Sequence, residues 1–224
     1  MPEDFNVELA QKLAEREGQR RRWEDLTEIL EAIALGLVAV ATAWSGYQAA
    51  LWNGRQAFLY GRSETTHVQA DEELTLGGQQ RLLDITTFNT WIQAQHAGDE
   101  ELADLYVRRF SPEYRVAFDA WLETDPLENP DAPPGPMFMP EYRNSLIEEG
   151  QRLNERAVVL FHEGTEARET SEQYVRITVL LATVLLLIAL SQRFKVRNAR
   201  IGLLGLAVVL FLVSAATIVG LPRL

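Results

Sequence analysis

Residues 32–52 read AIALGLVAVATAWSGYQAALW, a run without Asp, Glu, Lys or Arg. Residues 177–192 (ITVLLATVLLLIALSQ) and 201–222 (IGLLGLAVVLFLVSAATIVGLP) are equally free of charge. An α-helix rises about 1.5 Å per residue, so about 20 apolar residues cross a hydrocarbon core of roughly 30 Å. Tyr174 and Val175 extend the shorter second run. The sequence therefore predicts an all-α integral membrane protein whose three transmembrane helices cover residues 29–52, 174–192 and 201–222.

Basic residues beside these runs predict the orientation of the chain, because cytoplasmic flanks retain Lys and Arg. Three arginines occupy residues 20–22, and the turn at 193–200 holds four basic side chains: Arg193, Lys195, Arg197 and Arg200. We expect both groups in the cytoplasm. Residues 53–173 and the chain after residue 222 are then extracytoplasmic. Two lysines stand beside nineteen arginines, a bias typical of GC-rich bacterial genomes, so we expect a bacterial inner (plasma) membrane.

An alternative interpretation of the first run is a cleaved signal peptide, because Ala41-Thr42-Ala43 has the small-residue spacing of a cleavage site. The apolar run continues past that site to Trp52. We therefore favour an uncleaved membrane anchor.

The charge distribution limits the classes of partner. The 224-residue chain has a net charge of −11, and residues 51–172 contain ten arginines, no lysine and twenty-three acidic residues. Such an acidic region argues against nucleic-acid binding. The chain has no cysteine, so no disulfide stabilises the extracytoplasmic part.

The segments before and after the first run are predicted to be helical. Residues 1–28 read as a short amphipathic segment with Phe5, Leu9 and Leu13 on one side and an interruption at Gly18. This segment either lies at the inner membrane surface or is a solvated tail. Residues 47–95 contain no proline, so the first helix should continue, with a break near Gly77-Gly78 and a second piece at 82–95.

Two helix starts follow. Asp99 is a candidate N-cap for a helix at 99–110. Ser111 followed by Pro112 predicts another start, and that helix should end before Asp125-Pro126.

Residues 126–140 hold six prolines and should form an extended, stiff strap across the helices. The apolar stretch Met137-Phe138-Met139 within it needs cover. The strap either caps its own bundle or docks a partner.

A heptad pattern runs through residues 146–181. Every seventh residue is large or apolar: Leu146, Leu153, Leu160, Ala167, Tyr174 and Leu181. Four positions after each of the first five is a small residue: Gly150, Ala157, Gly164, Ser171 and Thr178. This alternation allows close approach of a second helix and predicts one continuous helix of about 50 residues. We expect its partner to be the small-residue face Gly46, Ala50 and Gly54, which gives a long antiparallel hairpin outside the membrane.

Three segments resemble an uncharacterised family of bacterial three-span inner-membrane proteins: AWSGYQAALWNG (43–54), FSPEYR (110–115) and PLENPDAP (126–133). The resemblance covers roughly residues 35–220. It implies the same order of one span, a helical region and two further spans, and it implies no activity, substrate or cofactor.

Candidate chemistry is sparse. Glu64 and His67 have the Glu-x-x-His spacing of di-iron carboxylate bundles, and His162 with Glu166 could also chelate a metal, but a second Glu-x-x-His is lacking. Solvated histidines, His96 included, are the simpler interpretation, so we predict no catalytic, cofactor or metal site.

Within the spans, Thr42, Ser45 and Gln48 could line a pore, although hydrogen bonds between packed helices are the usual role of such residues. The sequence thus favours a non-enzymatic structural or scaffolding protein. Its expected partners are the lipid bilayer and either further copies of itself or another envelope protein. The alternatives are a homo-oligomeric passive channel lined by the first span and a metal-dependent activity in the outer region.

Overall fold

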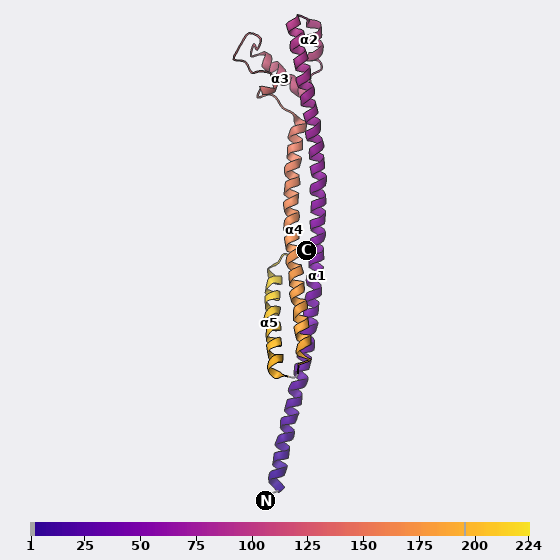
Figure 1. Cartoon of the computed structure of the whole chain (residues 1–224), viewed down its shortest axis with the longest axis vertical. Helices are drawn as coiled ribbons and strands as arrows, with labels where there is room; N and C mark the ends of the chain where they lie inside the picture. Colours follow the sequence, from indigo (N-terminus) through magenta and orange to yellow (C-terminus); the bar gives the residue numbers. More distant parts are fainter. Residues whose placement is uncertain (1–2, 195) are drawn as a thin grey trace. The chain divides into compact units, whose positions relative to one another are not determined.

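The computed structural model describes residues 3–194 and 196–224, and it describes side chains from residue 29 onward within those ranges. The described residues form five α-helices and one 3₁₀ helix and contain no strand (Figure 1). The α-helices are α1 (Glu3–Ala97), α2 (Glu100–Val107), α3 (Pro112–Leu122), α4 (Ser145–Ser191) and α5 (Arg197–Gly220), and η1 (Pro136–Phe138) is the 3₁₀ helix. Three helices are long and apolar enough to span a membrane, as predicted: α1, α4 and α5.

The chain divides into two compact units. Unit 1 comprises Met1–Ala57 and Thr165–Leu224, and unit 2 comprises Phe58–Gly164. Unit 1 contains all three charge-free runs, and unit 2 contains α2, α3 and η1.

The apolar interior of unit 1 is formed by side chains of α1, α4 and α5. Its buried members are Val38, Ile177, Leu181, Val184, Ile188 and Ala207. Polar contacts close one end of this interior. The Gln48 side chain accepts a hydrogen bond from the Leu224 amide (3.1 Å) and donates one to the Leu224 carbonyl (3.2 Å). The Tyr174 hydroxyl donates to the Pro222 carbonyl at 3.1 Å.

The outer surface of unit 1 is apolar. In the most apolar 18-residue stretch of α5, only 11% of the residues are buried within the chain. Val209, Leu212 and Val219 are among the exposed ones. An exposed apolar surface of this extent needs cover from outside the chain.

Unit 2 has an aromatic core at the end of α1. Its rings belong to Phe88, Trp91, Phe110, Tyr114, Phe118 and Trp121. Trp91 and Phe118 meet edge to face with ring centroids 4.8 Å apart, a favoured aromatic geometry. The predicted caps are confirmed: Asp99 accepts from the Leu102 amide, and Ser111 accepts from the Tyr114 amide with Pro112 in the first turn.

The predicted heptad seam of α4 is confirmed as its buried face. Leu160, Ala167, Tyr174 and Leu181 are buried, and so are the small residues Gly150, Ala157, Gly164 and Ser171. In unit 2, a Cβ on Gly150 would lie 2.7 Å from Leu74 Cγ and 3.0 Å from the Ala70 carbonyl oxygen. The helix also continues without interruption from Ser145 to Ser191, as expected.

The predicted break near Gly77-Gly78 is wrong, because α1 continues to Ala97. Gly77 serves close packing: a Cβ there would lie 2.7 Å from Ile147 Cγ1, and its carbonyl accepts a hydrogen bond from the Asn144 amide at 3.0 Å. The separate piece at 82–95 is accordingly part of α1. The helix also passes Gly18 without an end, whereas the side chains of residues 1–28, with the predicted apolar face of Phe5, Leu9 and Leu13, lie outside the described residues.

The prediction that Gly46, Ala50 and Gly54 of α1 pack against α4 is also wrong. A Cβ on Gly46 or Gly54 would meet no atom within 4 Å, and Ala50 is exposed. The buried face of α1 is rotated by one residue and carries Ser45 and Ala49 instead.

The strap follows expectation in part. Its backbone is not extended throughout, because Pro136–Phe138 form η1. Pro136 is buried and Met139 packs against the aromatic core, but Phe138 is exposed. The basic turn is shorter than predicted, because Arg197 and Arg200 already belong to α5, and Lys195 lies outside the described residues.

Gly150→Val should destabilise unit 2, since its branched carbons would overlap Leu74 and the Ala70 carbonyl. Overpacking costs about 1–3 kcal/mol, and each kcal/mol lowers Tm by about 2–4 °C in a chain of this size. Thermal unfolding in detergent, followed by circular dichroism, measures the change. The control is Gly61→Val on α1, where nothing lies within 4 Å. Equal Tm values for the two variants would contradict close packing at Gly150.

Candidate functional site

A buried carboxylate in unit 2 joins α1 to the start of α3. Asp84 is 3% exposed. Its Oδ2 accepts a hydrogen bond from the Ser111 hydroxyl at 3.1 Å, and its Oδ1 accepts from the Ser111 amide at 3.4 Å. The Ser111 hydroxyl oxygen in turn accepts from the Tyr114 amide at 3.2 Å. Asp84 thus holds the N-cap residue of α3, Ser111, in place.

The surroundings of Asp84 favour its neutral form. Burial raises the pKa of Asp84 above its usual value, the two hydrogen bonds from Ser111 oppose that rise, and the charge of Glu113 adds to it. Burial also raises the pKa of Tyr114 and of Tyr142, whose rings meet edge to face at 5.9 Å. The Tyr142 hydroxyl is buried, and none of its contacts with described residues has the geometry of a hydrogen bond.

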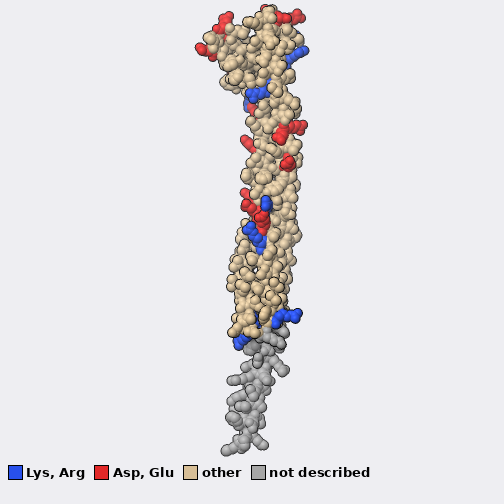
Figure 2. Space-filling model, viewed as in Figure 1, with Lys and Arg blue, Asp and Glu red and all other residues tan. Residues whose placement is uncertain are grey.

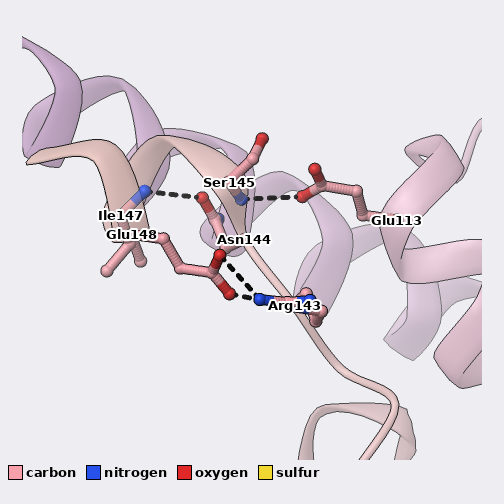
Figure 3. Close-up of polar contacts among 6 residues, drawn as sticks. All are labelled: Glu113, Arg143, Asn144, Ser145, Ile147 and Glu148. Atoms are coloured by element: carbon pink, nitrogen blue, oxygen red, sulfur yellow. Dashed lines mark hydrogen bonds and ion pairs between the residues drawn. The ribbon is translucent and has the colours of Figure 1, made fainter.

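The start of α4 is tied to the same region (Figure 3). Asn144 accepts from the Ile147 amide at 3.1 Å, which caps α4. Glu113 of α3 accepts from the Ser145 amide at 2.9 Å. Arg143 donates two hydrogen bonds to Glu148, at 2.9 and 3.0 Å. These contacts connect α3 and α4, while Asn144 also reaches α1 through Gly77.

Two open hollows adjoin these contacts. One, of about 310 Å³, is lined by Glu113, Glu141, Arg143 and Glu148 among others. The other, of about 500 Å³, is lined by Leu83, Asp84 and Arg109 among others. In the first hollow, Glu113 and Glu148 already accept hydrogen bonds from the protein. These two acids are therefore engaged in holding helix ends.

The candidate metal ligands named from the sequence lie away from Asp84. Glu64 and His67 are exposed on α1, and His162 is exposed on α4 beside the Phe161 ring. His96 is exposed at the end of α1. No three His, Asp or Glu side chains of residues 29–194 and 196–224 are grouped so that they could hold a metal ion.

The polar residues of the first span are placed inside unit 1. Ser45 and Gln48 are fully buried, and the Thr42 hydroxyl donates to the Val38 carbonyl at 2.7 Å. Of the buried polar atoms in the described residues, Ser45 Oγ is one that forms no hydrogen bond. Of the three residues, Gln48 hydrogen-bonds to a distant segment, Thr42 bonds within its own helix, and Ser45 is buried without a hydrogen bond.

The sequence analysis did not identify Asp84. A signal was present, because Asp84 stands among Leu82, Leu83 and Ile85, and the buried Phe88 and Trp91 lie four and seven positions further along. A carboxylate on the apolar face of a helix needs hydrogen-bond partners. Their identity could not be read from the sequence, since Ser111 is 27 residues away.

Comparisons with protein-family models, curated proteins and solved structures find no match. The resemblance carried by residues 43–54, 110–115 and 126–133 therefore stays a prediction.

Asp84→Asn should raise Tm at neutral pH, because the amide keeps the shape of the carboxyl group without a buried charge. The folded state binds the Asp84 proton more tightly than the unfolded state, whose pKa is near 3.8. The contribution of Asp84 to the free energy of unfolding is therefore fully present below that pH. It is lost as the pH rises through the raised pKa of Asp84 in the folded chain. We expect the Tm difference between Asp84→Asn and the parent chain to widen from pH 3.5 to 7.

Thermal unfolding across this pH range measures the difference, with Asp71→Asn, an exposed aspartate of α1, as the matched control. Asp84→Ala should lower Tm at every pH, since an unpaired buried donor costs about 1–3 kcal/mol. Equal losses for Asp84→Asn and Asp84→Ala at pH 7 would contradict the assignment.

Proposed function

We propose that this chain is a non-enzymatic inner-membrane protein of bacteria that holds unit 2 outside the membrane as a docking platform. Its partner is an envelope protein or a further copy of the chain. In this proposal the charge-free runs of α1, α4 and α5 cross the bilayer, and α1 with α4 forms a long antiparallel hairpin beyond it. Contacts inside unit 2 support the hairpin, because Ser63 donates to the Ala157 carbonyl at 2.7 Å while Gly77 lies against Ile147.

The membrane part of the proposal is supported by the surface of unit 1. Exposed apolar side chains surround its helices, and their exposure to water would be unfavourable in free energy. Figure 2 shows a band of unit 1 with almost no coloured side chains, bordered at one end by blue ones. Arginines at that end, with Arg197 among them, support its cytoplasmic placement.

The docking role rests on one observation: the strap exposes large apolar side chains on a fixed backbone. Leu127 is 68% and Phe138 is 62% exposed. The same segment is fastened to unit 2, because the Trp121 indole donates to the Pro133 carbonyl at 2.7 Å and Pro136 is buried. A preordered segment that presents apolar side chains binds a partner with little loss of conformational entropy.

The acidic surface of unit 2 supports a protein partner of basic character. Glu123, Asp125 and Glu128 are exposed between α3 and Pro130. Exposed carboxylates beside apolar anchors raise the association rate of a basic surface.

The channel alternative gains no support from unit 1, because Gln48 is engaged with the Leu224 backbone and Ser45 is buried within a single chain. The metal alternative rests on Glu64 and His67, which remain an exposed pair on α1.

The proposed topology predicts which introduced cysteines react from outside. The chain has no cysteine of its own, so each introduced thiol is unique. In right-side-out spheroplasts, a membrane-impermeant maleimide should label Glu128→Cys at once. It should label Asn198→Cys, in the first turn of α5, only after the membrane is opened. The reverse pattern would invert the topology.

Photo-crosslinking tests the docking role. A benzophenone amino acid in place of Leu127 or Phe138 should give a discrete product in native membranes, with the mass of a chain dimer or of one envelope protein. The same probe at Glu155, an exposed polar position of α4, is the control. Phe138→Ser in the Leu127 probe should remove the product while Tm stays unchanged. Membranes that give no product from either position would contradict the proposal.

A further inference from the structure

An apolar groove runs between all three helices of unit 1 at the end where α5 begins. Its volume is about 290 Å³, and its walls include Ala34 and Val38 of α1, Ile188 of α4, and Ala207 and Phe211 of α5. Ala34 and Ala207 are small where α1 and α5 face the groove, so they leave space between the helices.

The dimensions of the groove favour a hydrocarbon chain over a helix. On α1 it extends from Leu30 to Val38, which is about 12 Å of rise. One leaflet provides about 15 Å of hydrocarbon, half of the bilayer core. An acyl chain of that length needs only a narrow channel, whereas a helix is about 10 Å across.

Described arginines of the α4–α5 turn and of α5 lie near the mouth of the groove. Glu31 lines it and accepts a hydrogen bond from Arg200, which joins α1 to α5. Arg197 lies one turn before Arg200 on the face of α5 that continues through Leu204 into the groove. Arg193 and Arg197 are exposed, and neither forms an ion pair with another described residue. Among the side chains that the structure describes, three arginines (Arg193, Arg197 and Arg200) and one glutamate (Glu31) stand at this end.

The ion pair with Glu31 positions Arg200 without using all of its donors. A guanidinium has five N–H groups, and the Arg200 side chain is still 38% exposed. A phosphate oxygen at the mouth would meet Arg200 and Arg197, whose planar donor groups suit phosphate.

We propose that this groove binds one anionic phospholipid, with an acyl chain between Ala34 and Phe211 and the phosphate at Arg197 and Arg200. The proposal rests on the membrane topology inferred above, which places this end at the cytoplasmic leaflet. Basic pockets between transmembrane helices on that side bind anionic headgroups. A second copy of the chain is the competing occupant.

Native mass spectrometry of the full chain tests the proposal. Chains are released from nanodiscs that contain equal amounts of dioleoyl phosphatidylglycerol and dioleoyl phosphatidylcholine. We expect one phosphatidylglycerol to be retained under conditions that remove phosphatidylcholine. Arg197→Gln and Arg200→Gln should each reduce retention about fivefold, the usual contribution of one basic residue near an anionic surface. Arg176→Gln, an arginine of α4 outside the basic turn, is the charge control.

Ala34→Leu should also abolish retention, because its side chain fills the groove without a change of charge. Ala39→Leu, on the exposed side of the same helix, is the matched control. Equal retention of both lipids, or full retention in Ala34→Leu, would overturn the proposal, as would a dimer that carries no lipid. Labelling of Glu128→Cys and Asn198→Cys reports the topology independently. An absence of lipid binding together with the expected labelling would therefore contradict only the lipid-binding proposal.

Discussion

Close approach of helix backbones along the small residues of α4 is the constraint on which both units depend. In unit 2, Gly164 leaves room for the Tyr60 ring, since a Cβ there would lie 2.5 Å from it. In unit 1, the Ser171 hydroxyl donates to the Ala49 carbonyl at 2.9 Å. Such a short side chain reaches a carbonyl of another helix only when the two backbones are near each other. The heptad seam therefore sets helix separation as well as burial.

Close packing also determines how polar groups are placed. Thr178 and Ser214 donate to carbonyls four residues earlier in their own helices, so they enter an apolar interior without unpaired donors. Gln48 cannot be satisfied in this way and instead uses both of its amide atoms on the Leu224 backbone. Gln48 is thus engaged with another segment of the chain, and Thr178 and Ser214 are engaged within their own helices, which is why these groups give little support to a pore.

Local signals allowed much of the fold to be predicted, and pairings between distant residues escaped prediction. The charge-free runs, the seam of α4 and the caps at Asp99 and Ser111 each depend on residues within a few turns of one another. The face of α1 that packs against α4 could not be predicted in this way, because a small-residue spacing is present on more than one side of α1. The pair of Glu31 and Arg200 joins residues 169 positions apart, and nothing in either flanking sequence specifies the other.

Exposed apolar side chains have different physical consequences in the two units. In the proposed topology a bilayer covers those of unit 1, so residues such as Val209 lie against lipid. In the proposed topology those of unit 2 face water, where burial of one Phe side chain would be worth about 1.5–3 kcal/mol. Phe138 does not gain this within the chain, although its neighbours Pro136 and Met139 are buried or packed against the aromatic core. A phenylalanine held in water gains that free energy only when another molecule covers it, which is the physical basis of the proposed docking role.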